Sequence, residues 1–339
     1  MNQLRAGIIG VGGYGQHVLK ELGQNEHFVV QSIADQDREL AQDLADQYDA
    51  RPFDDYRRLI VETRPDVLFL MLPTYLCADC IRLAAHEKVH VFKESPLARN
   101  LPEGAEMIRA MEKAGCELAV GSRKRLAPGY LEARQVLSKQ EIGKVFLIRA
   151  EQFFYYQGKW DWRADPGLAG GGVLLESAYS LVDLIHWSVG VPESVYCLSS
   201  HECNRKVIPP YRTEDTVMMT MNFSDGAVGQ LTSSWMSGPE TERIVYHGVE
   251  GTLDAGPNHC RLYNAVGELQ NEAEFSVSDD RLISQQIKKF AECLLDRDAE
   301  PVSTVSEHLN NVSVVEAAYL SARTGMQEDL KVYDSVMAK

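Results

Sequence analysis

The first third of the chain alternates between short apolar runs and longer amphipathic stretches. Apolar runs of strand length occupy residues 4–9, 29–35, 66–73, 89–94 and 116–122. Between them, stretches rich in helix-forming residues occupy 14–23, 37–48, 78–88 and 103–115. Apolar strands that alternate with helices predict an α/β fold with a doubly wound parallel sheet.

The pattern changes after about residue 122. Six runs predict successive strands, at residues 145–156, 194–203, 215–223, 227–236, 243–255 and 260–265. Asp225-Gly226 separates two of these runs and is a hairpin signal. We therefore expect a second α/β domain with an open, mostly antiparallel sheet and helices near 171–189, 279–296 and 306–325. This divides the chain into residues 1–122 and 123–339.

A glycine cluster, GIIGVGGYG, directly follows the first predicted strand. Gly10, Gly12 and Gly15 match the pattern G-x-G-x-x-G, with Gly13 and Tyr14 inside it. In a dinucleotide-binding turn, the first glycine permits the tight turn and the second lets a pyrophosphate approach the backbone. The third packs the helix against the strand, and the N–H groups at the helix start bind the phosphates. A tight strand-to-helix turn without a ligand is the alternative.

Asp35 ends the second predicted strand, twenty residues beyond Gly15. An acidic residue at this spacing accepts hydrogen bonds from the adenosine ribose of a bound dinucleotide. Its charge would repel the 2′-phosphate of NADP, and Gln36 rather than an arginine follows it. The sequence therefore predicts NAD as the cofactor in preference to NADP. A helix N-cap or a turn residue is the alternative role for Asp35.

Composition narrows the choice of partners. The 339 residues are 45% hydrophobic and 24% charged, with a formal net charge of −15. An acidic chain is not suited to nucleic acid or anionic membranes, and we expect a small-molecule substrate. We expect no apolar run to approach the length needed to span a bilayer, and seven cysteines in a long chain favour a reducing cytoplasm. Cys77 and Cys80 form a lone C-x-x-C without further ligands, so we expect packing rather than a metal site.

Three further stretches resemble one family. They are "HVFKESPLA" at 90–98, "WRADPGLAGGGVLLESAYSLVDLIHWSVG" at 162–190 and "VEAAYLSARTG" at 315–325. With the glycine motif, they resemble the glucose–fructose oxidoreductase / inositol dehydrogenase / MocA family over nearly the whole chain. The resemblance implies a Rossmann domain followed by a domain whose open sheet commonly forms an oligomer interface. It also implies hydride transfer between a nicotinamide and a hydroxyl carbon of a sugar, cyclitol or related polyol.

The family's acid/base residues are changed in this sequence. The family motif E-K-P is Glu94-Ser95-Pro96 here, so a serine replaces the lysine. In the motif D-x-G-x-H, Glu176 replaces the aspartate and Ser180 the histidine. A carboxylate is therefore retained, whereas both basic groups are replaced by hydroxyls that only donate, accept or relay hydrogen bonds.

Several side chains could replace the missing bases. Lys93 lies two residues before Ser95, on the same face if the strand continues, and a solvated strand-end lysine is the alternative. Tyr179 adjoins Ser180, and Tyr155 precedes the W-R segment; packing in the core is the alternative for both. We expect the catalytic set to come from Glu176, Ser95, Ser180, Lys93 and Tyr179, with no metal.

The glycine motif, the resemblance and the neighbouring polar side chains together give candidate binding residues. Toward the cofactor these are Gly10, Gly12, Gly13, Tyr14, Gly15, Asp35, Pro73, Thr74, Glu94, Arg123, Trp162 and Arg163. Toward the substrate they are Lys93, Arg125, Tyr155, Glu176 and Asp183. We expect a homodimeric or homotetrameric NAD(H)-dependent oxidoreductase. The alternative is a non-catalytic NAD(H)-binding sensor that has lost its acid/base residues.

Overall fold

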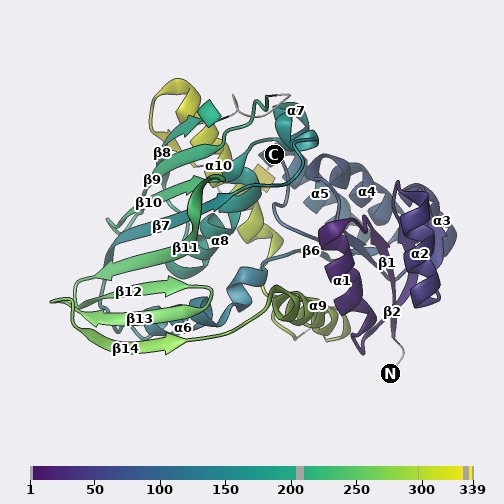
Figure 1. Ribbon diagram of the computed structural model, residues 1–339, viewed down its shortest axis with the longest axis horizontal. Helices are drawn as coiled ribbons and strands as arrows, with labels where there is room; N and C mark the ends of the chain where they lie inside the picture. The colour runs from purple at the N-terminus through teal and green to yellow at the C-terminus, as the bar shows by residue number, and fades with distance from the viewer. Residues whose placement is uncertain (1–2, 204–209, 297, 331–335, 338–339) are drawn as a thin grey trace. The chain divides into compact units, whose positions relative to one another are not determined.

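The computed structural model describes residues 3–203, 210–296, 298–330 and 336–337 (Figure 1). The chain forms two compact units. Unit 1 comprises residues 1–98, 102–123 and 278–308, and unit 2 comprises residues 99–101, 124–277 and 309–339. Residues 278–308 thus belong to the first unit, although a single division at residue 122 places them with the second.

Unit 1 contains the predicted parallel sheet, with the strand order β3-β2-β1-β4-β5-β6. Its strands are β1 (Leu4–Ile9), β2 (Phe28–Ala34), β3 (Arg51–Phe53), β4 (Val67–Leu70), β5 (His90–Lys93) and β6 (Leu118–Val120). Its helices are α1 (Gly13–Gly23), α2 (Arg38–Tyr48), α3 (Tyr56–Thr63), α4 (Thr74–Glu87), α5 (Leu101–Ala114) and α9 (Asp279–Leu295). Every strand predicted before residue 122 is present, and the doubly wound fold is confirmed. Strand β3 was not predicted because it is only three residues long and contains Pro52.

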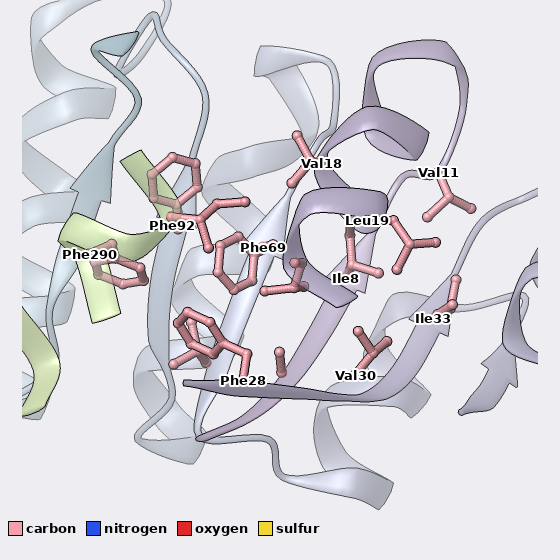
Figure 2. Packing of buried hydrophobic residues seen from close by; sticks show 14 of the residues in the cluster. Ile8, Val11, Val18, Leu19, Phe28, Val30, Ile33, Phe69, Phe92 and Phe290 are labelled. Atoms are coloured by element: carbon pink, nitrogen blue, oxygen red, sulfur yellow. The ribbon is translucent and has the colours of Figure 1, made fainter. Parts of the chain in front are cut away.

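The core of unit 1 is continuous from the sheet into two helices (Figure 2). Phe69 of β4 contacts Phe28 of β2 and Phe92 of the adjacent β5, with ring centroids 5.4 Å apart in each pair. Phe290 of α9 completes the cluster, 5.5 Å from Phe92. Helix α1 adds Val18 and its neighbours to the same cluster. Late residues of the chain are therefore part of the dinucleotide-type domain.

Unit 2 contains a nine-stranded sheet with the order β14-β13-β12-β11-β7-β10-β9-β8-β15 (Figure 1). All neighbouring pairs are antiparallel except β7 and β10, so the predicted mostly antiparallel sheet is confirmed. Its strands are β7 (Val145–Tyr155), β8 (Ser194–Ser200), β9 (Thr216–Asn222), β10 (Val228–Ser234), β11 (Met236–Gly248), β12 (Gly251–Gly256), β13 (His259–Asn264), β14 (Leu269–Glu274) and β15 (Glu328–Asp329). The Asp225-Gly226 signal is confirmed: it joins β9 to β10, and Gly226 has a φ of 88°.

The helices of unit 2 include a segment of unusual geometry. They are α6 (Pro128–Ser138), α7 (Pro166–Ala169) and α8 (Tyr179–Val189), together with most of α10 (Val305–Thr324). Short helical turns occur at η1 (Arg123–Leu126) and η2 (Trp162–Ala164), and a π-helical turn, η3 (Leu174–Ala178), directly precedes α8. Single π-turns inserted before or within α-helices are frequent at functional sites.

One apolar segment corrects a sequence expectation. Residues Pro166–Val189 span 24 residues and contain an 18-residue window with a mean hydropathy of 1.4, so their length and composition alone would allow a membrane span. However, 72% of the apolar window is buried inside the structure. Most of this apolar window thus packs inside the structure.

Candidate functional site

The glycines of the loop in unit 1 fall into two groups: some are required by the fold, and others border open space. Gly10 has a φ of 86°, and a Cβ there would collide with the carbonyl oxygen of Met71. A Cβ on Gly15 would collide with the carbonyl oxygen of Gly10. In contrast, a Cβ on Gly12 or Gly13 would meet nothing within 4 Å. The first and third glycines thus form the turn, whereas the middle glycines border open space.

The open space lies at the start of α1. Gly12 is the N-cap of this helix, no side chain caps it, and its first turn contains no acidic residue. The first N–H groups of a helix have no partner within the helix, and they carry its positive dipole end. This arrangement fits a dinucleotide pyrophosphate, which needs close backbone approach and N–H donors.

Asp35 lies just beyond the end of β2, beside the glycine loop. Its Oδ2 accepts a hydrogen bond from Val11 N at 2.8 Å, and its Oδ1 accepts one from Asp37 N at 3.0 Å. The N-cap of α2 is Asp37 rather than Asp35. Asp35 is therefore not the helix cap, whereas its bond from Asp37 N, two residues on, is that of a turn residue. Its half-buried carboxylate retains acceptor capacity beside the loop.

A second group of polar side chains surrounds Glu94, which directly follows β5. Its Oε1 accepts hydrogen bonds from Tyr14 Oη at 2.9 Å and from Gln286 Nε2 at 2.8 Å. The Arg123 guanidinium lies 3.6 Å from Glu94 Oε2 and 5.3 Å from the centre of the Tyr14 ring. Burial and the Glu94 charge raise the pKa of Tyr14 above its ordinary range, so its phenol stays protonated as a donor.

This cluster confirms part of the sequence analysis and adds one residue. Tyr14, Glu94 and Arg123 were predicted as cofactor residues, and the fold brings all three together. Gln286 was not predicted, because it lies on α9, more than 150 residues from the nearest of them, in no recognisable motif. Pro73 and Thr74 also lie at a carboxyl edge of the sheet, where they form the N-cap and first residue of α4 after β4.

Lys93 occupies an environment that neither sequence interpretation anticipated. The side chain is only 1% exposed, so the alternative of a solvated lysine is wrong. Its Nζ donates hydrogen bonds to the carbonyl oxygens of Glu94, at 2.7 Å, and Pro96. Burial lowers the pKa of Lys93 below its ordinary 10.5. The amine thus supports the backbone around half-buried Ser95, rather than reaching into open space as a replacement base.

In unit 2, Glu176 lies in the π-helical turn η3 and pairs with Arg163 of η2. Arg163 Nε donates to Glu176 Oε1 at 2.5 Å. The other oxygen, Glu176 Oε2, is buried and has no hydrogen-bond partner among the described residues. Desolvation raises the pKa of Glu176 above its ordinary 4.5, although Arg163 opposes the shift. One carboxylate oxygen is therefore held in place while the other remains available for a proton or a hydroxyl group.

Aromatic rings border this ion pair. The Arg163 guanidinium lies 4.3 Å from the centre of the Trp162 ring and 5.8 Å from that of Tyr156. Trp160 stacks on Tyr211 at 4.1 Å, and Tyr156 lies 4.9 Å from Trp160. Trp162 and Arg163 thus lie next to the predicted carboxylate, in an aromatic setting of the kind that pockets for small organic molecules use.

The remaining unit 2 candidates divide between accessible and buried positions. Ser180 is half-buried, and its hydroxyl donates to Ser177 O at 2.9 Å. Tyr155 is 60% exposed at the end of β7. Tyr179 is only 1% exposed, which favours the packing interpretation over a role in proton transfer.

Arg125 and Asp183, both predicted to contact substrate, form a buried pair instead. The Arg125 guanidinium donates to the two Asp183 oxygens at 2.9 and 2.7 Å, and Asn311 Nδ2 donates to Asp183 Oδ1 at 2.8 Å. All three side chains are buried. Because each charge is compensated within unit 2, we assign the pair a structural role and correct the substrate-binding prediction.

The glycines at 171 and 172 are explained by a residue that sequence reasoning missed. Glu214 accepts hydrogen bonds from Gly172 N at 2.7 Å, Leu174 N at 3.0 Å and Tyr319 Oη at 2.7 Å. A Cβ on Gly171 would collide with Tyr319 Oη, and one on Gly172 with the carbonyl oxygen of Glu214. The GGG and E-A-A-Y motifs therefore meet at one buried carboxylate, just ahead of the turn that carries Glu176.

The two cysteines of the C-x-x-C pair take no part in the polar clusters described above. Cys77 and Cys80 are both buried in α4, and burial raises the pKa of the Cys80 thiol. Among the described residues, no group of three or more histidine, cysteine or acidic side chains could hold a metal ion. The two thiols pack in the core of unit 1.

Comparison with known proteins places these features in a family. Residues 4–122 match the profile described as "Oxidoreductase family, NAD-binding Rossmann fold", and residues 130–254 match "GFO/IDH/MocA C-terminal domain". The chain is 27% identical over 333 residues to D-xylose 1-dehydrogenase (NADP(+)) 2 of Haloferax volcanii, covering 96% of this chain and 99% of that protein. It is 24% identical over 349 residues to scyllo-inositol 2-dehydrogenase (NAD(+)) of Bacillus subtilis, covering 98% and 97%.

Solved structures show the same fold. Levoglucosan dehydrogenase in complex with NADH and levoglucosan superimposes with a TM-score of 0.87 at 19% identity, covering 97% of this chain and all of that one. An aldose-aldose oxidoreductase from Caulobacter crescentus gives a TM-score of 0.86 at 23% identity. The two profile matches cover most of the chain in the expected order, and this chain belongs to the GFO/IDH/MocA family of oxidoreductases.

Proposed function

We propose that this protein is an NAD(H)-dependent oxidoreductase that acts on a hydroxyl carbon of a sugar, cyclitol or related polyol. Family membership supports the oxidoreductase class, and relatives named as xylose and inositol dehydrogenases support the substrate class. The observation that carries the proposal is Glu176 Oε2, a buried carboxylate oxygen without a partner among the described residues.

The cofactor fits unit 1. The N–H groups at the start of α1, beside Gly12 and Gly13, would bind the pyrophosphate, and Asp35 would accept hydrogen bonds from the adenosine ribose. The Asp35 carboxylate would repel a 2′-phosphate, which favours NAD over NADP. When bound, this cofactor supplies or accepts the hydride. The Tyr14–Glu94–Arg123 cluster in the same unit offers further polar contacts.

Proton transfer falls to Glu176 in this proposal. During alcohol oxidation, the hydroxyl oxygen loses its proton as the carbon loses hydride, and the carboxylate takes that proton at Oε2. Arg163 fixes the orientation by holding Oε1. Because burial raises the pKa of Glu176, the carboxyl exchanges protons closer to neutral pH than an exposed glutamate does. Ser95 and Ser180 remain candidates for relaying protons through their hydroxyl groups.

The test follows NADH absorbance with a panel of pentoses, hexoses, sugar phosphates and cyclitols. For any substrate that turns over, Glu176→Gln should lower kcat by about 10²–10⁴-fold, the usual contribution of a general acid or base. Glu240→Gln, an exposed glutamate of the same unit, serves as the matched control and should be unaffected. Unchanged turnover in Glu176→Gln would exclude this carboxylate from the mechanism.

A non-catalytic NAD(H) sensor is the second candidate, favoured by Ser95 and Ser180 at the positions of the family's bases. NADH titration monitored by fluorescence distinguishes the two. Tight NADH binding without turnover of any compound in the panel would support the sensor. Absence of NADH binding would exclude both functions.

We also propose that copies of the chain associate through the open face of the unit 2 sheet. Tyr196 and Leu198 of β8, Met218 of β9 and Val228 of β10 are exposed apolar side chains on adjacent strands, and Leu198 is 56% exposed. Leu198 lies directly opposite Met218, and apolar side chains exposed on one sheet are typical of an interface. Light scattering should give a dimer or tetramer, and Leu198→Asp should shift it toward the monomer.

The seven cysteines are all thiols, which suits a reducing cytoplasm.

A further inference from the structure

Unit 1 contains a cavity that the cofactor residues do not explain. It has a volume of about 190 Å³ and lies beside the edge strand β6, between that strand, helix α9 and residues 301–305. Most of its wall is apolar, and it includes Phe92, Val120, Phe290 and Val302. An engineered apolar cavity of about 150 Å³ holds benzene, so the size suits a small ring with a substituent.

One polar wall residue is incompletely satisfied. Gln286 is only 2% exposed and lines the cavity. Its Nε2 donates to Glu94, whereas its Oε1 is buried with no hydrogen-bond partner among the described residues. A buried acceptor without a donor costs about 1–3 kcal/mol, and a ligand that donates one hydrogen bond would remove that cost.

Most of the other polar wall groups are already engaged. Ser122 Oγ and Ser303 Oγ lie 3.1 and 3.0 Å from His308 Nε2, and Ser303 Oγ also donates to Val120 O. Lys289 Nζ pairs with Glu292 at 2.9 Å. Glu117 and Lys289, the two charged residues of the wall, are both exposed to solvent. The buried part of the described wall thus carries no charge, which favours a neutral molecule over an ion.

We propose that this cavity is a binding site for a small neutral aromatic molecule that carries one hydroxyl donor, of the phenol class. The ring packs against Phe92, Phe290 and Val302, and the hydroxyl donates to Gln286 Oε1. Through Gln286 Nε2, the occupied site contacts Glu94, the residue that also binds Tyr14 of the cofactor loop. The site lies wholly in unit 1 and does not depend on the proposed substrate or reaction.

Phenol titrated into the full-length protein, monitored by calorimetry and located by crystal soaking, tests the site. Phenol should bind saturably in the cavity, and anisole, which has the same ring but no donor, should bind about tenfold more weakly. Val302→Trp, which fills the cavity, should abolish phenol binding and leave NADH binding intact. Glu117→Gln serves as the control at the same wall and should bind phenol normally.

The phenol–anisole comparison uses the unaltered chain, so it remains decisive even if Val302→Trp fails to fold. Equal affinities for phenol and anisole would overturn the assignment of Gln286 as the recognition group. Absence of saturable phenol binding, or a phenol molecule located outside the cavity, would overturn the site itself.

Discussion

The carboxylate of Glu214 gives the most direct test of how this fold supports its candidate site. It accepts hydrogen bonds from Gly172 N, Leu174 N and Tyr319 Oη, all inside unit 2. Glu214→Ala removes the acceptor from three donors. Each buried donor left unsatisfied costs about 1–3 kcal/mol, so the loss for three donors should total roughly 3–9 kcal/mol. Glu214→Gln places an amide N–H₂ against one donor, and should cost about 1–3 kcal/mol.

Tryptophan fluorescence reports this loss selectively. All four tryptophans, at positions 160, 162, 187 and 235, belong to unit 2. Urea unfolding followed by their emission therefore measures the unit that contains Glu214. At an m-value of about 3 kcal/mol/M, a loss of 3 kcal/mol lowers the midpoint by about 1 M. Glu240→Gln, at an exposed glutamate of the same unit, should move the midpoint little.

The pH dependence of unfolding provides a second readout. Burial raises the pKa of Glu214 above its ordinary 4.5, so the folded state holds the proton more tightly than the unfolded chain. This contribution to stability is complete below pH 4.5 and is lost as the pH rises through the raised pKa. Glu214→Gln should lack that component. Glu214→Ala and Glu214→Gln midpoints as high as that of Glu240→Gln would refute the role of Glu214 in holding the glycine turn.

Three further predictions follow from the same structure. Gly12→Ala should fold normally but weaken NADH binding measured by fluorescence, because its Cβ enters only the open space, whereas Gly15→Ala should lower the thermal midpoint through backbone collision. Arg163 lowers the pKa of Glu176, so Arg163→Met should move the acidic limb of the pH profile of kcat/KM to higher pH by about 1–2 units. An unmoved limb would exclude Glu176 as the titrating group. Because the folded state lowers the pKa of Lys93, the free energy of unfolding of the wild-type protein should rise with pH between that lowered pKa and 10.5. Unfolding followed by circular dichroism should show this rise, and Lys93→Met should lack it.

The sequence by itself determined the elements of this protein and the cofactor loop. Hydrophobic periodicity is a local property, so the strands that flank Gly10 and Asp35 could be predicted directly. The spacing of Gly10, Gly12, Gly15 and Asp35 also predicts dinucleotide binding from the local sequence, because the phosphates bind at one turn and the start of the helix that follows it. Strand β3 escaped prediction because two of its three residues are exposed and one is Pro52, so it forms no apolar run.

Only the tertiary structure decided which charged side chains are available. Lys93 and Arg125 resemble accessible cations in the sequence, yet the fold buries both against carbonyl or carboxylate oxygens. Gln286 and Glu214 lie in no predictive motif, and they matter because distant segments bring them to Glu94 and to the glycine turn. Burial and hydrogen-bond partners depend on residues far away in the chain, so local patterns determine where an element forms but not which of its polar groups remain available for chemistry.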